Sequence, residues 1–438
     1  MKQATTGFRR NRKNRTALER LDRSVAPAAI GPYQGVVFAH AEGCHVTDLD
    51  GNVFLDATSG GYSSNVGYSH PKVLAAVKSQ LSRISSAYLR PQDLHITLAE
   101  KLKDVAPGNL SNGLVGFCNT GAEGIELSIQ TVKNYSKRPF LIAFQGAFHG
   151  RTAGALSLTT SSSELRSGLP PLISDVALAP FPRPSITSST DYHGDDGFAC
   201  LERLGEIFAT VTNPKQVAAV YTEPIQAHAG VIIPPDGFFR RLSRLCHEHG
   251  ILLVDDESVT GFGRTGRMFG IEHWDVTPDV MCVAKALASG LPLAAVIGPK
   301  DVMQNFPGGG TFSGSSLPFA AACANIDVIR REGLVQNAER VGTYLLKRLN
   351  EVAEKNEKIK EVRGKGLLIG IELEKRNGRL ATIEAHRVMQ EAFKKGVLLS
   401  TCGIYENVIR LSPPLTFTSK MADLTVNVIS KALHQCLS

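Results

Sequence analysis

Several short apolar runs recur along the chain, and a polar, glycine-bearing motif follows each of them at once. PFLIAF (139–144) leads into QGAFHGRT, VAAVY (217–221) into TEPIQ, ILLV (251–254) into DDES, and VMCVA (280–284) into Lys285. Runs of four or five apolar residues separated by helical stretches indicate an α/β fold with a mostly parallel sheet covered on both faces. Ligands bind such sheets at the carboxyl ends of the strands, so we expect the four motifs to converge on one site.

A second, smaller α+β domain is predicted beyond about residue 325. Long amphipathic helices over 319–333, 336–354 and near 383–395 lie among the short strands GLLIGIEL, VLLS and VIRLS. The early piece HVTDLDGNVFLDAT (45–58) is patterned as a hairpin and is expected to join this domain. The predicted units are a basic, flexible tail (1–25), an N-terminal segment joining the small domain (26–70), a large domain (71–324) and the C-terminal small domain (325–438).

The charge and the cysteines narrow the class of protein. Residues 1–25 carry +6 of the net charge of +7, because they hold eight basic residues against Glu19 and Asp22. This pattern is typical of a solvated tail, with a targeting or anion-binding role as the alternative, so we expect no nucleic-acid partner. The eight cysteines are scattered without a C-x-x-C pair, which indicates reduced thiols in a cytoplasmic protein. No apolar run reaches the roughly 18–20 residues of a membrane span, so we expect no membrane partner.

The stretch ILLVDDESVTGFGRTG (251–266) also matches the dinucleotide fingerprint G-x-G-x-x-G through Gly261, Gly263 and Gly266. In that fingerprint the first glycine follows the strand directly and a helix opens at the last one. Here polar and mixed residues separate the strand from Gly261, and the stretch after Gly266 soon reaches Pro278. A dinucleotide site is therefore not expected, and the carboxylates at this strand end need another explanation.

Three other motifs carry chemistry. Lys285 directly follows a buried strand, where a lysine either snorkels at the edge of the core or reacts. CNTGAEGIE (118–126) places small residues and a hydroxyl at a helix N-terminus, which is typical of a phosphate cradle but also of an ordinary N-cap by Thr120. Phe148, beside His149, either stacks on a flat ligand ring or is a core aromatic next to a surface histidine. Together the motifs describe a planar ring with a phosphate arm, held covalently by a lysine.

In their order along the chain, these motifs resemble the class III aminotransferases, the pyridoxal-phosphate enzymes that include ornithine, acetylornithine and 4-aminobutyrate aminotransferases. The resemblance covers about residues 30–430. It rests on the motifs GYSHP, NTGAEGIE, FHGRT, EPIQ, DDESVTGFGRTG, AKALASGLPLAAVIG, GTFSGSSL and RLSPPL. It implies fold type I, with a large domain built on a mostly parallel sheet covered by helices and a smaller α+β domain.

The resemblance explains the carboxylates that end the third apolar run. Asp256 looks like the residue that pairs with the pyridine nitrogen of pyridoxal 5'-phosphate, because a nearby anion keeps that nitrogen protonated and the ring a strong electron sink. Lys285 looks like the Schiff-base lysine, whose freed amine would also move a proton on the substrate. Asp255 and Glu257 are then expected to point away and to make structural hydrogen bonds.

The rest of the cofactor site also follows from the resemblance. Phe148 looks like the aromatic that stacks on the cofactor ring. Thr311 resembles the threonine that reaches the phosphate from a neighbouring subunit, which implies a homodimer with shared sites. The phosphate cradle is expected at Thr120, Gly121 and Ala122.

The substrate residues are Glu223 and Arg410 by the same resemblance. Arg410 would grip a substrate α-carboxylate bidentately, and Glu223 would pair with it when an ω-amine occupies the site. The chain is accordingly predicted to be a ping-pong aminotransferase that moves an amino group from a primary ω-amine or basic amino acid to a 2-oxo acid.

The sequence departs from the family pattern in several places. Ser258 and Val259 stand where valine and glutamine are usual, Tyr68 where histidine is usual, GSS (314–316) for Gly-Asn-Pro, and Ala227-His228 for Gly-Glu. These changes bear on the substrate and the rate more than on the cofactor.

Other functions remain open at this point. A decarboxylase, racemase or aminomutase of the same family would keep the cofactor and change the outcome. A cofactor-binding regulatory protein is less consistent with an intact Lys285 and Asp256. A metal hydrolase using His70 and His149 lacks a cluster with metal-ligand spacing, so no metal is expected.

Overall fold

The centre of the large domain is a seven-stranded sheet in the order β4-β10-β9-β8-β7-β5-β6. The computed structural model describes residues 12–26, 35–88, 90–169, 172–182, 198–375 and 378–437. The neighbours from β9 to β6 pair in parallel, whereas β10 is antiparallel to both β4 and β9, so the predicted mostly parallel sheet is confirmed. The strands are β4 (Leu114–Cys118), β5 (Phe140–Phe144), β6 (Val176–Ala179), β7 (Val217–Thr222), β8 (Leu252–Asp256), β9 (Val280–Val283) and β10 (Ala294–Gly298).

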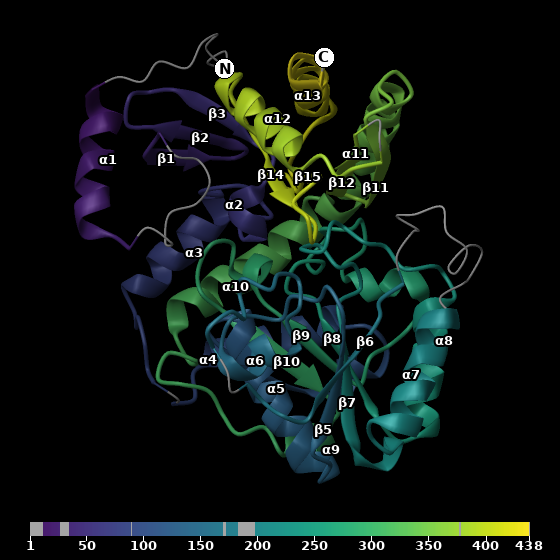
Figure 1. The fold of residues 1–438 in the computed structure, drawn as a ribbon. Coiled ribbons are helices and arrows are strands. Elements are labelled where there is room, and N and C mark those ends of the chain that lie inside the picture. The colour runs from purple at the N-terminus through teal and green to yellow at the C-terminus, as the bar shows by residue number, and fades with distance from the viewer. Residues whose placement is uncertain are drawn as a thin grey trace.

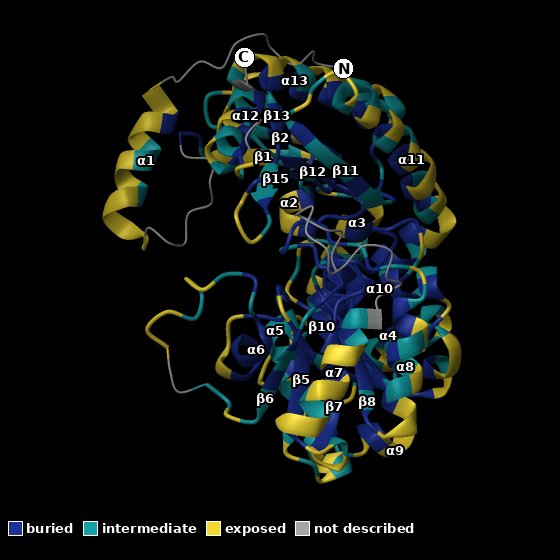
Figure 2. Cartoon of the chain, turned by 45° about the vertical axis from the view of Figure 1, so that its right-hand side comes forward, coloured by how far each residue is buried: buried dark blue, intermediate teal, exposed yellow. Residues whose placement is uncertain are grey.

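Helices cover this sheet and keep its strands out of water, as the dark blue strands in Figure 2 show. Every residue of β7, β9 and β10 is buried, because short β-branched and small apolar side chains fill both faces. The α-helices here are α3 (Pro71–Leu81), α4 (Asp93–Val105), α5 (Gly121–Ser136), α6 (Ala153–Leu158), α7 (Phe198–Thr210), α8 (Phe238–Glu248), α9 (Lys300–Met303) and α10 (Ser316–Arg331). The 3₁₀ helices are η2 (Gly108–Asn112), η3 (Pro214–Gln216), η4 (Gly270–Trp274) and η5 (Lys285–Ala288).

The small domain, above the large one in Figure 1, contains two four-stranded sheets. One is antiparallel in the order β11-β12-β15-β14, and the other has the order β1-β2-β3-β13. The predicted hairpin is confirmed as β2 and β3, and the parallel pairing of β3 with β13 joins it to the C-terminal part of the chain. The strands are β1 (Phe38–Glu42), β2 (His45–Asp48), β3 (Val53–Asp56), β11 (Ile359–Lys365), β12 (Leu368–Leu373), β13 (Val397–Leu398), β14 (Ser400–Cys402) and β15 (Val408–Leu411), and the helices are α11 (Leu334–Ala353), α12 (Thr382–Lys394) and α13 (Ser419–Leu437).

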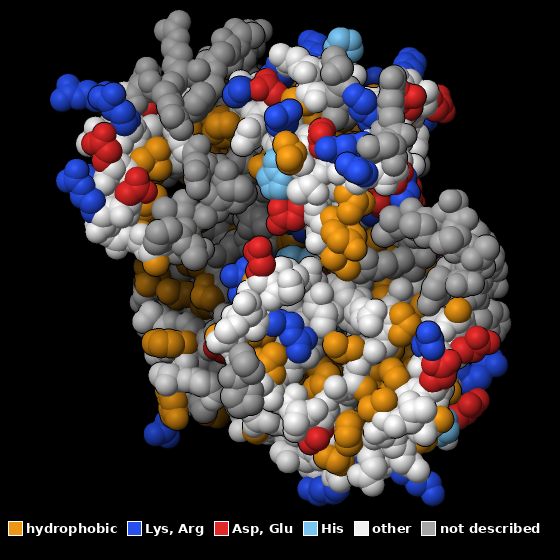
Figure 3. Space-filling model, viewed as in Figure 1, with side chains coloured by type: hydrophobic (Ala, Val, Ile, Leu, Met, Phe, Trp, Pro, Cys, Tyr) orange, Lys and Arg blue, Asp and Glu red, His pale blue; other side chains and the backbone are white. Residues whose placement is uncertain are grey.

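The N-terminal part of the chain differs from the flexible tail that the sequence predicts over 1–25. Residues Arg12–Ser24 form helix α1, at the left of Figure 1. Its one buried residue, Asn14, donates to Asp48 at 2.9 Å and accepts from the Val37 amide at 2.8 Å, so α1 is anchored to the β1–β3 sheet. Lys and Arg side chains are seen on the outer face of α1 in Figure 3, with acidic ones among them. Residues 1–11 lie outside the described part of the chain, so the flexible tail stays a prediction there.

A buried arginine ties the two domains together. Arg264 donates to the carbonyl oxygens of Leu367, at 3.1 Å, and of Pro413, both in the small domain. It also donates to Ser59, at 2.9 Å, and to Asn65, so helix α2 (Ser59–Tyr62) is fixed at the same junction. The predicted division at residue 324 falls inside α10, because this helix continues from the large domain toward α11. Gly261, Gly263 and Gly266 lie in turns and bends, and the next helix along this stretch is η4, which begins at Gly270.

Two further expectations can be compared with the structure. The aperiodic stretch 160–200 contains β6 and the start of α7, while residues 170–171 and 183–197 lie outside the described part. All eight cysteines are free thiols, as the scattered spacing predicts. Among the described residues, no helix is both long and apolar enough to cross a membrane, and no group of residues could hold a metal ion.

Candidate active site

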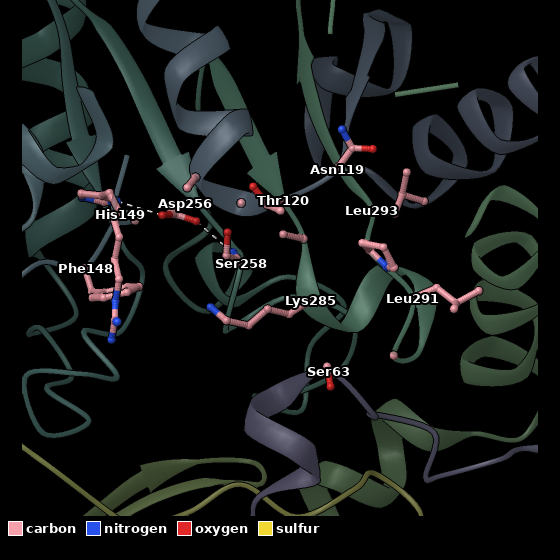
Figure 4. Close-up of a pocket in the computed structure, with 17 residues that line it drawn as sticks. Ser63, Asn119, Thr120, Phe148, His149, Asp256, Ser258, Lys285, Leu291 and Leu293 are labelled. Carbon is pink, nitrogen blue, oxygen red and sulfur yellow. Dashed lines mark hydrogen bonds and ion pairs between the residues drawn. The ribbon is translucent and has the colours of Figure 1, made fainter. Parts of the chain in front are cut away.

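A cavity of about 570 Å³ opens at the carboxyl ends of the large-domain strands. Six of the nine predicted site residues line it, and they come from segments that directly follow β4, β5, β8 and β9. Figure 4 shows Asp256, Ser258 and Thr120 on one side of this space, with the Lys285 side chain reaching toward the gap between Ser258 and Phe148. The predicted residues that line the cavity are Thr120, Gly121, Ala122, Phe148, Asp256 and Lys285.

Asp256, the last residue of β8, is buried and held in one orientation. One of its oxygens lies 2.8 Å from Nδ1 of His149, and the other accepts from the amide of Ser258 at 3.0 Å. Burial alone would raise the pKa of Asp256, but the hydrogen bond and positive charge of His149 outweigh it, so the pKa is lowered. The cavity therefore has a fixed anion at one end.

His149 is part of this pair and not the surface histidine that the sequence suggested as one alternative. Burial would lower its pKa, but the hydrogen bond and charge of Asp256 raise it above the ordinary value. Its other ring nitrogen, Nε2, is buried and has no hydrogen-bond partner among the described residues. The motif that carries His149 follows β5, two strands away from β8, so only the strand order could have revealed the pairing.

Lys285 lies at the start of η5, directly after β9. Its backbone φ of +38° is in the left-handed region, which a side-chain-bearing residue adopts at a cost of about 1–3 kcal/mol and which recurs at functional sites. Burial lowers the pKa of Lys285, while the negative charges of Asp256 and Glu223 oppose that effect. A lysine held in this way has a larger neutral fraction at physiological pH than an exposed one, so its amine is more nucleophilic.

The N-terminus of α5 lies next to Ser258 and forms a floor of the cavity. Thr120 is the N-cap, as the alternative interpretation of CNTGAEGIE expected, because its Oγ1 accepts from the Glu123 amide at 3.2 Å. A Cβ on Gly121 would lie 2.9 Å from Oγ of Ser258 and 3.3 Å from Cβ of Ala284, so only glycine leaves this floor open. Unpaired amide groups and the helix dipole make such a floor suitable for an anion.

Phe148 and Glu223 meet beside Lys285. The amide of Phe148 donates to Oε1 of Glu223 at 2.9 Å, and the Phe148 ring stacks on His228 with centroids 4.1 Å apart and planes at 14°. Burial raises the pKa of Glu223 to about 7, although the positive charge of His149 opposes this. Glu223 can therefore hold or release a proton near neutral pH.

Arg410, on β15, approaches the site from the small domain. Its Nε donates to Oγ of Ser400 at 3.2 Å, and its guanidinium lies over the Tyr62 ring, 4.8 Å from the centroid. The same ring lies 5.8 Å from Nζ of Lys285, so both cations are near the Tyr62 ring. Arg410 and Glu223 both act on the pKa of Lys285, which places them around its amine.

Thr311 is exposed and is not among the residues that line this cavity. It lies in a turn, next to Phe312, which is 65% exposed. Its predicted role toward a second subunit stays a prediction.

The other two carboxylates of the DDES motif behave differently from each other. Glu257 accepts from the Ile271 amide at 2.8 Å and from Thr260, so the expected structural hydrogen bonds are present. Asp255 was expected to make such bonds too, but both its oxygens are buried without a partner among the described residues. Burial and the neighbouring charge of Glu257 raise the pKa of Asp255 well above the ordinary value.

Sequence reasoning missed two more residues at the site. Arg151, in the FHGRT motif, lines the cavity and adds a cation at its opening. His228 was noted only as a departure from the family pattern, yet it covers one face of the Phe148 ring. Both lie in turns after strands, where the sequence gives the position but not the direction of the side chain.

Comparison with known proteins gives matches across nearly the whole chain. The family described as Aminotransferase class-III matches residues 28–433. The chain is 37% identical to the alanine/serine racemase of Pyrococcus horikoshii, covering 90% of this chain and 85% of that protein. It is 34% identical to the 4-aminobutyrate aminotransferase of Mycobacterium leprae, covering 95% and 94%.

Solved structures agree with these relatives. An amine transaminase from an uncultivated Pseudomonas species, described in its PLP-bound form, superposes with a TM-score of 0.85 at 30% identity. The superposition covers 94% of this chain and 97% of that one, so the likeness includes both domains.

Proposed function

This chain belongs to the class III aminotransferases, a family of pyridoxal-phosphate enzymes, and from that premise we propose that it binds pyridoxal 5'-phosphate in the cavity beside Lys285. It would transfer an amino group from a primary ω-amine or basic amino acid to a 2-oxo acid by a ping-pong mechanism. The observation that carries the proposal is one cavity lined by a fixed anion, a glycine-floored helix N-terminus and a strained lysine.

The residues present fit this cofactor. Gly121 and the N-terminus of α5 form a cradle for a phosphate, which a Cβ would fill. Asp256 supplies the anion for a ring nitrogen, and Phe148 and Ser258 line the same cavity. Ser258 is small and polar. It would pack against the ring of the cofactor less tightly than the valine that is usual at this position.

The chain's own residues divide the chemistry among them. When bound, the cofactor supplies an electron-withdrawing ring that stabilises negative charge at the substrate carbon. His149 and the Ser258 amide hold Asp256 in place and ionised, so it can keep a proton on that ring. Lys285, with its lowered pKa, would accept the proton from the substrate carbon and pass it to a carbon of the cofactor.

The residues on the substrate side of the cavity would allow it to accept both a 2-oxo acid and an ω-amine. Arg410 offers a guanidinium for the carboxylate of a 2-oxo acid, and Glu223 is a nearby carboxyl that titrates near pH 7. When an ω-amine donor has no carboxylate to bind Arg410, the carboxylate of Glu223 would pair with Arg410 instead. The 4-aminobutyrate aminotransferase among the relatives is consistent with an ω-amine donor.

A homodimer is the second part of the proposal. Ser86 and Ser315 form an isolated β-bridge, which places Tyr88 and Phe312 on neighbouring segments. These aromatics are 55% and 65% exposed in the single chain, and an apolar patch of this kind is typical of a surface covered by another copy. Thr311 lies on the same segment, so a dimer formed here would bring it toward the partner's site.

Visible absorbance tests the proposal directly. The purified protein should be yellow, lose its colour with an ω-amine such as 4-aminobutyrate, and regain it with 2-oxoglutarate or pyruvate. The acceptor that restores the colour also names the second substrate. A protein that pyridoxal phosphate cannot turn yellow would remove the basis of the proposal.

A second function is supported by one specific comparison. The Pyrococcus relative is named an alanine/serine racemase, so this chain could invert an amino acid instead of transferring its amine. Racemisation needs no 2-oxo acid. Chiral chromatography after incubation with L-alanine alone should show no D-alanine if the chain only transfers amino groups, whereas accumulating D-alanine would favour a racemase.

A further inference from the structure

The turn that contains His228 belongs to the large domain, and side chains and a backbone amide of the small domain hold its backbone. It begins after β7, where Gln226 and Ile232 form an isolated bridge, and its tip spans residues 227–231. We name residues 227–231 the clasp turn. It belongs by sequence to the cofactor-binding domain, but its backbone partners described below come from β11, β15 and the residue after β14.

Arg363, on β11, makes the most contacts with the clasp turn. Its Nη2 and Nε donate to the carbonyl oxygen of Gly230 at 2.6 and 3.0 Å, and Nε also donates to that of Val231 at 3.1 Å. Its Nη1 bonds Glu361 and Glu372, each at 2.6 Å, so the buried guanidinium is itself held in place. Charge-assisted bonds of this kind are stronger than neutral ones.

The small domain adds two more bonds and a close fit. The Gly403 amide donates to the His228 carbonyl at 2.9 Å, and Arg410 donates to the Ala227 carbonyl at 3.5 Å. A Cβ on Gly370 would lie 3.2 Å from the Gly230 oxygen, so the turn sits closely against β12. The clasp turn is therefore fixed to the small domain.

The backbone of the clasp turn is strained, which supports the view that these contacts impose its shape. Val231 is β-branched and has a φ of +58°, in the left-handed region, and Gly230 has a φ of +118°. Such conformations persist only where the surroundings determine them. Both strained residues are those whose carbonyls Arg363 binds.

The side chain of the clasp turn reaches back to the cofactor cavity. His228 stacks on Phe148 at 4.1 Å, which leaves the other face of the Phe148 ring for the cavity. Burial, and then the positive charges of Arg410, Lys285 and Arg151, lower the pKa of His228 well below its ordinary value. The stacked ring is therefore a neutral imidazole, and it fixes Phe148 without adding a charge.

We propose that His228 is a positioning residue for Phe148, and that Arg363 acts through the clasp turn to hold His228 there. The small domain thereby sets how firmly Phe148 can stack on a bound ring. This inference rests on the proposed function, because it takes Phe148 to be the residue that contacts the cofactor.

The test measures cofactor affinity and not turnover. Purified protein is equilibrated with graded pyridoxal phosphate, and the dissociation constant is read from visible absorbance. His228→Ala should raise this constant roughly three- to tenfold, the usual range for one aromatic pair, whereas His228→Phe, which keeps the stack, should stay within about twofold. Matched control His249→Ala removes an edge contact with Phe208 outside the site and should change nothing.

Arg363 is tested in a double-mutant cycle with His228. Arg363→Met should weaken cofactor binding on its own but have no further effect in the His228→Ala background, because Arg363 acts on Phe148 only through His228. The matched control is Arg138→Met, since Arg138 also binds carbonyl oxygens, those of Val217, His249 and Gly250, but away from the cavity. It should lower the unfolding temperature without changing the dissociation constant. If Arg363→Met does not fold, Arg363→Lys gives the same comparison.

The outcomes separate this inference from the proposed function. Unchanged affinity in His228→Ala, together with a loss in Phe148→Ala, would overturn the inference alone. Unchanged affinity in Phe148→Ala would overturn the role of Phe148 in the proposed function. Additive effects of the two substitutions would show that Arg363 does not act through His228.

Discussion

The two sides of the cavity are assembled by different means. The cofactor side (Thr120, Gly121, Asp256 and Lys285) is built from residues that directly follow strands of one sheet. The substrate side (Glu223 and Arg410) combines the residue that follows β7 with a strand of the other domain, and His228 connects the two sides through its stacking on Phe148. A rigid sheet fixes the first group, whereas the position of the second depends on how the domains meet.

This difference separates the chemistry from its selectivity. Under the proposed function, the cofactor side would hold the charges that amine transfer on this cofactor needs, and it is fixed within the large domain. The substrate side can change with the clasp turn or β15 while the sheet stays the same. We therefore expect substitutions on the cofactor side to affect every substrate, and those on the substrate side to affect some substrates more than others.

The largest effect is expected for Lys285→Ala. Removing the amine takes away both the covalent link and the proton carrier, so turnover should fall by at least about a thousandfold. Initial rates and the visible spectrum measure this, with Lys300→Ala, an exposed lysine, as the control. A variant that stays yellow and active would show that another group does this work.

Asp256→Asn should follow, because the amide keeps the shape and loses the anion. Electrostatic groups of this kind contribute about a hundredfold to a thousandfold in turnover, and the loss should be similar for every amine donor. Steady-state rates with two unrelated donors test this. A loss of rate with only one donor would show that Asp256 acts on that substrate and not on the cofactor.

The cofactor side was largely predictable from the sequence. Asp256, Lys285 and Thr120 each end or follow an apolar run, and parallel strands place such positions at one edge. The pairing of His149 with Asp256 was not predictable in the same way, since it depends on β5 and β8 being separated by β7 alone. Asp255 differs from these residues, because only the structure reveals that its oxygens have no hydrogen-bond partner among the described residues.

Arg410→Ala should separate the two half-reactions. Loss of a bidentate charged contact should slow the reaction with 2-oxo acids about a hundredfold, while a simple amine that lacks a carboxylate should react nearly as before. Rapid-mixing absorbance measures each half-reaction alone, and Arg340→Ala, an exposed small-domain arginine, is the control. Equal losses in both halves would remove the assigned role.

The substrate side was harder to predict for a physical reason. Glu223 and Arg410 could be named from motifs, but their surroundings come from contacts between segments far apart in the sequence. His228 is the clearest case, since its stacking on Phe148 depends on a turn held by Arg363 and Gly403. The pattern of apolar runs carries no information on where such a turn points.

Glu223→Gln should change the pH dependence of stability. The folded-state pKa of about 7 lies above the ordinary value of 4.5, so the folded protein binds more protons in that window and loses stability as pH rises through it. The loss amounts to about 3 kcal/mol and is complete above pH 7, and glutamine removes it. In thermal unfolding from pH 4 to 8, the stability of Glu223→Gln relative to the wild type should increase with pH. The stability of Glu248→Gln, changed at an exposed site, should follow the wild type. Parallel curves for Glu223→Gln and wild type would contradict the assignment.

The smallest effect is expected for Thr311→Ala. This substitution tests whether the cofactor side of the cavity is completed by a second subunit. Losing one hydrogen bond to a phosphate should weaken cofactor binding about fivefold, as absorbance titration would show. If Thr311 serves the partner's site, a mixed dimer of Thr311→Ala and Lys285→Ala subunits should bind the cofactor normally at its one working lysine. That lysine sits on the Thr311→Ala subunit, and the Lys285→Ala subunit supplies its intact threonine. A mixed dimer as weak as the Thr311→Ala homodimer would instead place Thr311 in the site of its own chain, and the cofactor side would then be complete within one subunit.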